Sequence, residues 1–299
     1  MTVERTVFNE RNITKTIFLA PAVAVCLVFM VVPGIMEFYL SLTDWNGISS
    51  VYNYIGFRNF RQIFDDRVFY LALRNTLIYS FLVVLLQHTF SLAMAVIINR
   101  GIKGQRFYKT VLFIPCLLSS IVVGLAFNFI YNPINGQLNF MLGKLGLVSL
   151  AKTNWLGDPK IALFSIIFVS VWQFVGYCMI IYMAGLKGIP KEIIEAAGVD
   201  GAGNWHMFRH IEFPSIAPAF TINTVLSIIG TLKAFEVVYA MTGGGPGNAT
   251  DVIATYIYKV GFSSSRMGYG TAVSLILFLM IVVISFIQVK ILKARENEL

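Results

Sequence analysis

Charged residues are scarce in this 299-residue sequence. Asp, Glu, Lys and Arg make up 13% of it, about half their share in a typical soluble domain. Apolar residues make up 57%, and the mean hydropathy is +0.74. A water-soluble globule of this size has too little interior to hide so many apolar side chains, and the same composition excludes a disordered chain. The sequence therefore belongs in a lipid bilayer.

Cysteine is also rare, and the glycines follow no triplet period, which excludes a disulfide scaffold and a collagen helix. The sequence has no G-x-x-x-x-G-K-[ST] motif, so we expect no P-loop for ATP, and it lacks the enzyme motifs G-x-S-x-G and H-E-x-x-H. His206 and His210 have a spacing that could hold a metal, but no nearby cysteine supports such a site. We expect no catalytic residue and no metal.

Six charge-poor runs are long enough to cross the hydrocarbon, which takes about 20 apolar residues. The third run is too long for one helix, and the turn residues Pro133, Asn135 and Gly136 are expected to end it near Tyr131. The sequence thus predicts an all-α integral membrane protein with six transmembrane helices. The runs are Ile17–Met36, Asn75–Asn99, Thr110–Gly143, Ile161–Leu186, Phe213–Leu232 and Met267–Val289.

The distribution of Lys and Arg predicts that both termini are cytoplasmic. Thirteen of the 23 basic residues then lie in inner segments and nine in outer loops, and the inner loop from Arg100 to Lys109 has four bases and no acid. The first run lacks a cleavage site, so we interpret it as a retained anchor. The predicted segments are a cytoplasmic tail (1–16), a first transmembrane helix (17–42), an extracytoplasmic loop (43–70), a five-helix core (71–290) and a cytoplasmic tail (291–299).

The cytoplasmic loop 187–216 has the pattern of a helical hairpin between the fourth and fifth spans. Pro190 suits the start of a short helix, and Gly198 is placed to end it. Asn204 can cap a second helix, which Pro214 closes. An alternative is a hairpin whose apolar stripe rests on lipid. A DNA-binding helix-turn-helix is disfavoured because acids outnumber bases and the segment lies between two spans.

One motif in this loop carries a family resemblance. The pattern Glu195-Ala-Ala-x-x-Asp200-Gly-Ala-x5-Phe208-x2-Ile211-x2-Pro214 resembles the EAA loop of ABC importer permeases. Phe213 departs from the leucine common before that proline, but it is also apolar. Other segments are similar to the carbohydrate-uptake branch and its maltose-permease-like subunit: Leu40-Ser-Leu-Thr-Asp-Trp45, Asn75-Thr, Trp155-Leu-Gly-Asp-Pro159 and Gly243-Gly-Gly-Pro246 followed by Tyr256-x-Tyr258.

The resemblance implies a type I ABC importer permease fold and a transport subunit rather than an enzyme. It implies a heterodimer with a second homologous permease, two cytoplasmic ATPase subunits that hold ATP and Mg, an extracytoplasmic solute-binding protein, and a sugar or oligosaccharide as substrate. The protein would lie in the bacterial cytoplasmic (inner) membrane. It is expected to need no cofactor of its own and to bind no nucleic acid. The residues implied in ATPase coupling are Glu195, Ala196, Ala197, Gly198, Asp200 and Gly201.

Polar residues follow one face of two predicted spans. Ser170, Gln173 and Tyr177 share a face of the fourth span, and Ser227 and Thr231 share a face of the fifth. Hydroxyls, an amide and aromatic rings suit a neutral sugar, although single hydroxyls often join helices instead. The resemblance implies a substrate role at these positions. The candidate substrate contacts are Ser120, Ser170, Trp172, Gln173, Tyr177, Ser227 and Thr231.

Lys233 and Glu236 form an acid–base pair deep in a span, spaced so that they can neutralise each other. They are expected to be a structural pair near the outer end of the fifth span, or alternatively a gate or a substrate contact. Gln87 and His88 are expected to join helices. Two alternative functions stay open. A glycerol-phosphate-type permease should have extra cations in its cavity, and an ion-coupled secondary transporter should have buried carboxylates. The polar stripes disfavour a scaffold without transport.

Overall fold

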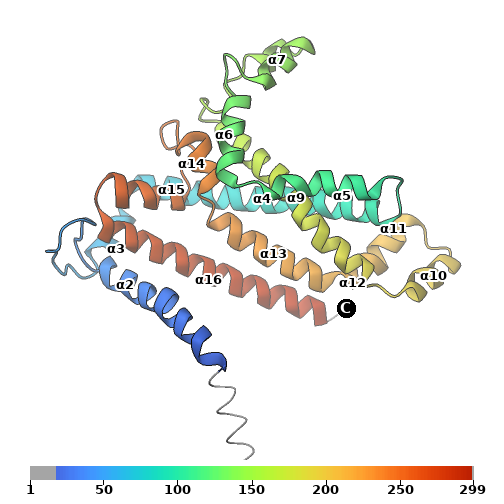
Figure 1. Ribbon diagram of the computed structural model, residues 1–299, viewed down its shortest axis with the longest axis horizontal. Coiled ribbons are helices and arrows are strands. Elements are labelled where there is room, and N and C mark those ends of the chain that lie inside the picture. Colours follow the sequence, from blue (N-terminus) through green and yellow to red (C-terminus); the bar gives the residue numbers. More distant parts are fainter. Residues whose placement is uncertain (1–17, 298–299) are drawn as a thin grey trace, which may run out of the picture. The chain divides into compact units, whose positions relative to one another are not determined.

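The computed structural model describes residues 18–297, and these residues are almost entirely helical (Figure 1). No β-strand occurs in this range, although one isolated bridge pairs Thr43 with Tyr54. The all-α prediction is therefore confirmed for the described residues. The α-helices are α2 (Val32–Ser41), α3 (Arg58–Phe64), α4 (Arg67–Asn99), α5 (Gln105–Phe113), α6 (Ser120–Ile130), α7 (Gln137–Lys144), α8 (Val148–Ala151), α9 (Ala162–Lys187), α10 (Lys191–Val199), α11 (Asn204–Met207), α12 (Phe213–Ser215), α13 (Ala217–Leu232), α14 (Glu236–Thr242), α15 (Ile253–Tyr258) and α16 (Met267–Asn297).

Four shorter segments interrupt this series. A 3₁₀ turn covers Ile114–Leu117, and π-helical turns cover Leu27–Val31, Phe208–Glu212 and Lys259–Ser263. The described chain divides into two compact units, one of residues 18–65 with 257–276 and one of residues 66–256 with 277–297. The larger unit holds the candidate site. The predicted tail 1–16 lies outside the described residues.

Four helices are long and apolar enough to cross a membrane: Phe18–Ser41, Arg67–Asn99, Ala162–Lys187 and Met267–Ala294. Two helix pairs reach that length only together, and each pair is bent. The pair Gln105–Leu117 and Ser120–Ile130 bends by 97°, and the pair Asn204–Ser215 and Ala217–Leu232 bends by 70°. Length and composition thus allow four to six spans, and each predicted run contributes to one of these helices or pairs.

The third predicted span is not one straight helix, which corrects the sequence interpretation. α5 ends at Phe113, a 3₁₀ turn carries Pro115, and Leu118 is extended with ψ of 143° before α6 begins. Proline cannot donate its backbone nitrogen to a helical hydrogen bond, so the helix is weakened at this point. The predicted end of the run is confirmed, because α6 ends at Ile130 and the Asn132 side chain accepts from two backbone N–H groups of the following turn.

Local side-chain bonds also set where the second long helix starts. The Asp66 carboxylate accepts hydrogen bonds from the backbone N–H groups of Val68 and Phe69, at 2.9 and 3.3 Å, and so caps α4. α4 therefore begins at Arg67, inside the segment 43–70 that was predicted as loop. It continues without a break for 33 residues, a length of about 50 Å at 1.5 Å per residue.

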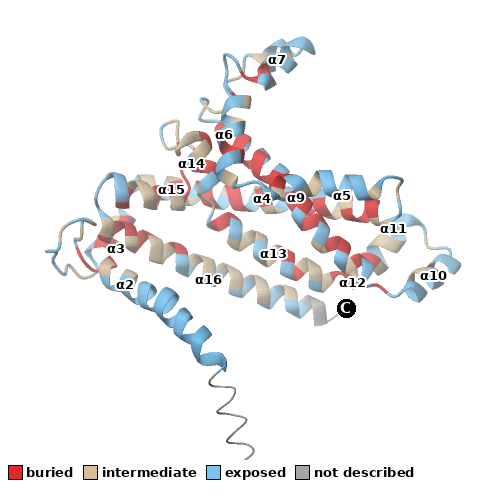
Figure 2. Cartoon of the chain, viewed as in Figure 1, coloured by how far each residue is buried: buried red, intermediate tan, exposed pale blue. Residues whose placement is uncertain are grey.

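α4 and α9 form the centre of the larger unit (Figures 1 and 2). One cluster of buried side chains includes Tyr79 and Val83 of α4 and Ile166 of α9, and a second includes Ala95 of α4 and Met179 of α9. Gln87 and His88 face this interface, where Gln87 donates to the Cys178 sulfur and His88 bonds the Tyr182 hydroxyl. The expectation that both residues join helices is confirmed.

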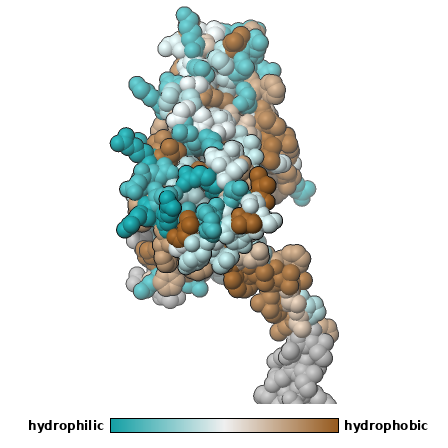
Figure 3. All heavy atoms as spheres, turned by 90° about the vertical axis from the view of Figure 1, so that its left-hand side faces the viewer, coloured by the Kyte–Doolittle hydropathy of each residue, from teal (hydrophilic) through white to brown (hydrophobic). Residues whose placement is uncertain are grey.

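The first helical run, Phe18–Ser41, has an almost wholly exposed apolar surface in this chain (Figures 2 and 3). Phe18 is 80% exposed, Phe29 73% and Met30 71%. Apolar side chains that meet no protein partner need lipid or another chain around them. This helix coincides with the predicted first transmembrane segment 17–42, of which residue 17 lies outside the described range.

Candidate functional site: a membrane cavity and a cytoplasmic hairpin

A cavity of about 290 Å³ lies inside the larger unit and is lined by residues from α4, α6, α9, α13 and α14. Its lining combines hydroxyl, phenol, amide and carboxylate groups with apolar side chains. The volume is at the lower limit of ordinary small-molecule pockets. The lining residues are Tyr79, Val83, Gln87, Ser120, Ser170, Phe174, Tyr177, Leu226, Ser227, Gly230, Thr231, Ala234, Glu236 and Val237.

Five of the seven predicted substrate contacts come together in this lining: Ser120, Ser170, Tyr177, Ser227 and Thr231. They come from three helices that lie far apart in the sequence. Helical spacing alone places Ser170 and Tyr177 on one face of α9, and Ser227 and Thr231 on one face of α13. Tertiary packing then brings these two faces and Ser120 together around the same cavity.

Most hydroxyls of the lining already have protein partners. The Tyr79 hydroxyl donates to Ser170 Oγ at 2.8 Å, and Ser170 Oγ itself donates to the Ile166 carbonyl at 3.0 Å. Thr231 Oγ1 lies 2.7 Å from Ser80 Oγ. These bonds join α4 to α9 and α4 to α13, so the same groups hold helices together and face the cavity. A hydroxyl can accept a further bond while it donates one.

Two predicted contacts, Trp172 and Gln173, are not among the residues that line the cavity. Trp172 packs edge-on against Phe127, with ring centroids 5.2 Å apart. Gln173 is 1% exposed and donates from Nε2 to the Leu118 carbonyl at 3.0 Å and to Ser120 Oγ at 3.4 Å. The Gln173 amide therefore satisfies a backbone carbonyl that the break between α5 and α6 leaves without a helical donor.

Sequence reasoning missed the α4 side of the cavity. Tyr79, Val83 and Gln87 are spaced four residues apart and line it from one face of α4. The four-residue spacing was visible in the sequence. It did not form a continuous polar stripe, because Val83 between the two polar residues is apolar. Phe174, which supplies an aromatic surface beside Tyr177, gave no signal separable from an ordinary apolar span.

The predicted Lys233–Glu236 pair does not form. No ion pair joins the two side chains among residues 18–297. α13 ends at Leu232 and α14 begins at Glu236, so the two residues do not share a helix and the expected i, i+3 geometry is absent. Glu236 lines the cavity, and Lys233 is not among the lining residues.

The loop predicted to be cytoplasmic forms a hairpin of two helical arms (residues 191–215), which we call the coupling hairpin after the role predicted for it. Its first arm, α10, presents Glu195, Ala196, Gly198 and Asp200 to the surface and buries Ala197. The helix runs past Gly198 to Val199, and the turn uses Gly201, which has φ of +80°. The predicted end at Gly198 is thus wrong, since Gly201 takes the left-handed conformation that favours glycine.

The second arm runs through α11, a π-helical turn and α12. Gly203, not Asn204, occupies the position before its first turn, and no side chain caps it. The prediction that Asn204 caps this arm is therefore wrong. Pro214 lies near the end of the arm, which stops at Ser215 and bends into α13.

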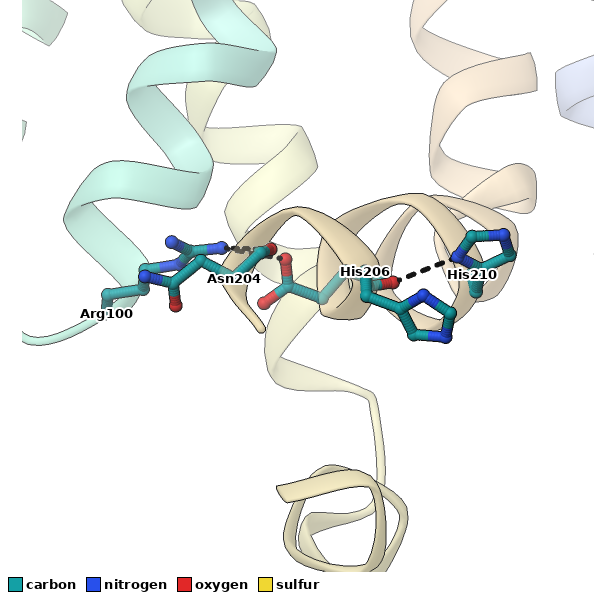
Figure 4. Close-up of polar contacts among 5 residues, drawn as sticks. Arg100, Asn204, His206 and His210 are labelled. Carbon is teal, nitrogen blue, oxygen red and sulfur yellow. Dashed lines mark hydrogen bonds and ion pairs between the residues drawn. The ribbon is translucent and has the colours of Figure 1, made fainter. Parts of the chain in front are cut away.

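The two histidines of this arm lie side by side. His206 and His210 stack with ring centroids 4.2 Å apart, and His210 Nδ1 lies 3.3 Å from the His206 carbonyl oxygen (Figure 4). No group of three metal-binding side chains occurs in the described part of the chain.

A polar contact also orders the loop that follows α2 in the smaller unit. The Asp44 carboxylate accepts from the backbone N–H of Asn53 at 2.6 Å and from its side-chain amide at 3.1 Å. These hydrogen bonds, the backbone one first, hold the pKa of Asp44 below its ordinary value.

Comparison with known proteins identifies the class. The chain belongs to the family described as the inner membrane component of binding-protein-dependent transport systems, whose model matches residues 87–296. It is 37% identical over 97% of its length to the probable ABC transporter permease protein YurN of Bacillus subtilis, of which 99% is covered. It is 33% identical to the probable starch degradation products transport system permease protein AmyD of Thermoanaerobacterium thermosulfurigenes, with 98% of both chains covered.

The fold has solved relatives in the same class. One is a chain of a bacterial alginate ABC transporter, solved in complex with an alginate pentasaccharide-bound periplasmic protein, with a TM-score of 0.83, 26% identity and 93% of each chain covered. The predicted relationship to ABC importer permeases is confirmed. The protein is thus a multi-pass membrane subunit of a transport system rather than an enzyme.

Proposed function

We propose that this chain forms half of the pathway by which a saccharide is imported. The observation that carries the proposal is the cavity between α4, α9 and α13, whose hydroxyl, phenol and amide groups alternate with aromatic surfaces. Sugars offer hydroxyls that both donate and accept, together with flat apolar faces for aromatic contact. Support also comes from one relative named for starch degradation products and from a structural neighbour whose periplasmic partner carries an alginate pentasaccharide.

A neutral substrate fits this lining better than a phosphate ester. Glu236 faces the cavity and Lys233 does not, so the cavity contains a carboxylate without a matching cation. An anionic phosphate would be repelled there. This arrangement disfavours the glycerol-phosphate alternative.

The proposed topology has six spans with both termini in the cytoplasm. It takes the bent pair α5–α6 as one span, and α13 as the fifth span with the coupling hairpin on the cytoplasmic side. α13 has 16 residues, about 24 Å of helix, which is slightly short for the hydrocarbon and places its ends near the interfaces. The four bases between Arg100 and Lys109 support the orientation.

The proposed partners follow from what the chain lacks by itself. A second, homologous permease would complete the small cavity, an extracytoplasmic solute-binding protein would deliver the sugar, and two cytoplasmic ATPase subunits would hold ATP and Mg. The chain would need no cofactor of its own. The membrane would be the bacterial cytoplasmic membrane. The exposed face of α10, with Glu195, Ala196 and Gly198, would dock on an ATPase, where small side chains permit close approach and the carboxylate can meet an arginine.

The coupling hairpin would convert closure of the ATPase subunits into opening of the cavity. α10 is a compact helix joined to α9 through Gly188–Pro190, and the second arm leads directly into α13. A push on the hairpin therefore reaches two helices that line the cavity. Such motion between inward-open and outward-open states is alternating access, in which ATP shifts a two-state equilibrium.

Uptake into vesicles tests the proposal. The chain, its second permease, the ATPase subunits and the binding protein are reconstituted with labelled maltodextrin or another saccharide that the binding protein retains. We expect uptake that requires ATP on the cytoplasmic side and the binding protein on the other. Uptake that persists without ATP and collapses with a proton or sodium gradient would refute the proposal in favour of an ion-coupled carrier.

A second test concerns docking. Glu195→Lys combined with Gly198→Asp should abolish uptake while the chain still inserts, because the variant reverses one charge and adds a side chain on the docking face. Lys103→Glu reverses a charge in the neighbouring cytoplasmic loop, where Lys103 is exposed, and serves as the control. Normal uptake by the Glu195/Gly198 variant would disprove the docking role.

A further inference from the structure

One arginine ties the second arm of the coupling hairpin to the end of α4. Arg100 follows α4 directly, and its Nη2 donates to the Asn204 carbonyl at 3.1 Å (Figure 4). The same nitrogen lies 3.8 Å from Glu212 Oε2. Asn204 is the first residue of α11, and Glu212 is the last residue of the π-helical turn that follows it. A single guanidinium thus holds residues from both ends of this stretch.

The Arg100–Glu212 pair is not an ordinary surface salt bridge. The Glu212 side chain is 8% exposed and that of Arg100 is 36% exposed. Glu212 Oε2 is buried and makes no hydrogen bond with the described residues. Burial raises the pKa of the Glu212 carboxyl, and the charge of Arg100 opposes that effect. A buried carboxylate with one cation as its counter-charge depends strongly on that cation.

Packing between the same two elements is incomplete. A groove of about 670 Å³ runs between the last turns of α4 and the second arm, lined by Leu92, Val96 and Ile97 on one side and by Trp205 and Phe208 on the other. Phe208 reaches the buried cluster around Val96, but the groove leaves part of the facing surfaces without contact. Arg100 and Asn204 also line this groove, so their hydrogen bond joins its two sides.

Arg100 attaches the coupling hairpin to α4, a helix to which the hairpin has no direct covalent connection. The coupling hairpin is joined covalently to α9 at one end and to α13 at the other. Two attachments leave a body free to rotate about the line between them. Apolar contacts of Ile194 and Phe208 with the cluster around Val96 oppose such rotation. The polar contacts of Arg100 add a directional attachment between the hairpin and the end of α4. That helix carries Tyr79 and Gln87 to the cavity.

We propose that Arg100 is a positioning residue that makes the coupling hairpin and α4 move as one body. This inference rests on the proposed function of the hairpin in ATP-driven transport. Movement of α10 would then reach the cavity along α4 as well as along α9 and α13. Gln87 lies 13 residues before Arg100, about 20 Å along a continuous helix, which transmits a rigid displacement without a hinge.

The experiment measures coupling rather than folding. In the reconstituted importer, Arg100→Ala should retain ATP hydrolysis and lower the saccharide transported per ATP about tenfold, within the range of measured coupling effects. Arg100→Lys keeps the charge but loses the planar fork of donors, and an intermediate value is expected. Lys103→Ala, which removes an exposed cation three residues away, should match the wild type.

Charge reversal separates a link from a general loss of stability. Arg100→Glu and Glu212→Arg should each uncouple transport, and the double variant should recover most of the lost coupling because the pair is restored with reversed polarity. Unchanged coupling in Arg100→Ala, or a double variant no better than the worse single variant, would overturn the inference. If Arg100→Ala fails to assemble, the Arg100→Lys and double-reversal comparisons decide in the same way.

The outcomes distinguish this inference from the proposed function. A wild-type importer that does not link ATP hydrolysis to uptake would remove the proposed function itself. A wild-type importer that does so, with Arg100 variants that behave identically, would leave the proposed function intact and refute the role of Arg100 alone.

Discussion

Gly176→Ala should destabilise the protein, because Gly176 is the point where the end of α5 crosses α9. A Cβ at this position would overlap the Leu112 carbonyl group and stand 2.9 Å from the Phe113 nitrogen. These are backbone atoms, which cannot rotate aside as a side chain can. Overpacking of this kind costs up to about 3 kcal/mol, and the better helix propensity of alanine returns about 1 kcal/mol. The net loss of about 2 kcal/mol corresponds to a fall in Tm of roughly 5 °C.

Thermal unfolding of the purified protein in detergent measures this effect. Gly34→Ala, which changes an open site on α2 with nothing within 4 Å of the new carbon, is the matched control. We expect the control to leave Tm unchanged or slightly higher. A Gly176→Ala variant as stable as the control would refute the close packing of α5 on α9 and, with it, the placement of the break between α5 and α6.

Three further perturbations test other parts of the structure. Tyr79→Phe removes the hydroxyl that donates to Ser170. It should lower the free energy of unfolding by about 0.6 kcal/mol, the typical contribution of a hydrogen bond between membrane helices. It should also raise the transport KM several-fold, which corresponds to the free energy of about one neutral hydrogen bond. Gln173→Leu should lower Tm by several degrees through the unpaired carbonyl at the break, with little change in KM, because its side chain lies outside the cavity; a raised KM at normal Tm would contradict this. The pKa of Asp44 lies below the ordinary carboxyl value of 3.8. Its hydrogen bonds to Asn53 therefore order the loop after α2 fully at pH values above 3.8, and this stabilisation is lost as the pH falls through the lowered pKa. Hydrogen exchange should therefore show the loop loosening only in that acidic window, and Asp44→Asn should remove the pH dependence.

The long spans were predictable because their signal is local. α9 (Ala162–Lys187) differs by one residue at each end from the uncharged run Ile161–Leu186. An apolar stretch of that length has no stable conformation in lipid other than a helix, since each backbone N–H and C=O must be satisfied within the segment. The turn after Ile130 was equally local, because asparagine and proline set its geometry.

The breaks within spans were not predictable in the same way. Pro115 marks the first break in the local sequence, but the chain turns fully only at Leu118, whose carbonyl accepts a hydrogen bond from Gln173 of α9. The local sequence around that break does not contain Gln173. The interruption after Leu232 separates Lys233 from Glu236, which a continuous helix would have placed on one face.

The amino-acid sequence by itself determined that this chain enters a membrane as helices and that it carries the hairpin motif of ABC permeases, because hydropathy and a contiguous motif act over short stretches of chain. Only the tertiary structure decided which polar residues share a cavity, that Gln173 supports a backbone break instead, and that Arg100 reaches the hairpin. The contacts of Gln173 and Arg100 join residues 53 to 112 positions apart. Their contact depends on how whole helices pack, which no local pattern records.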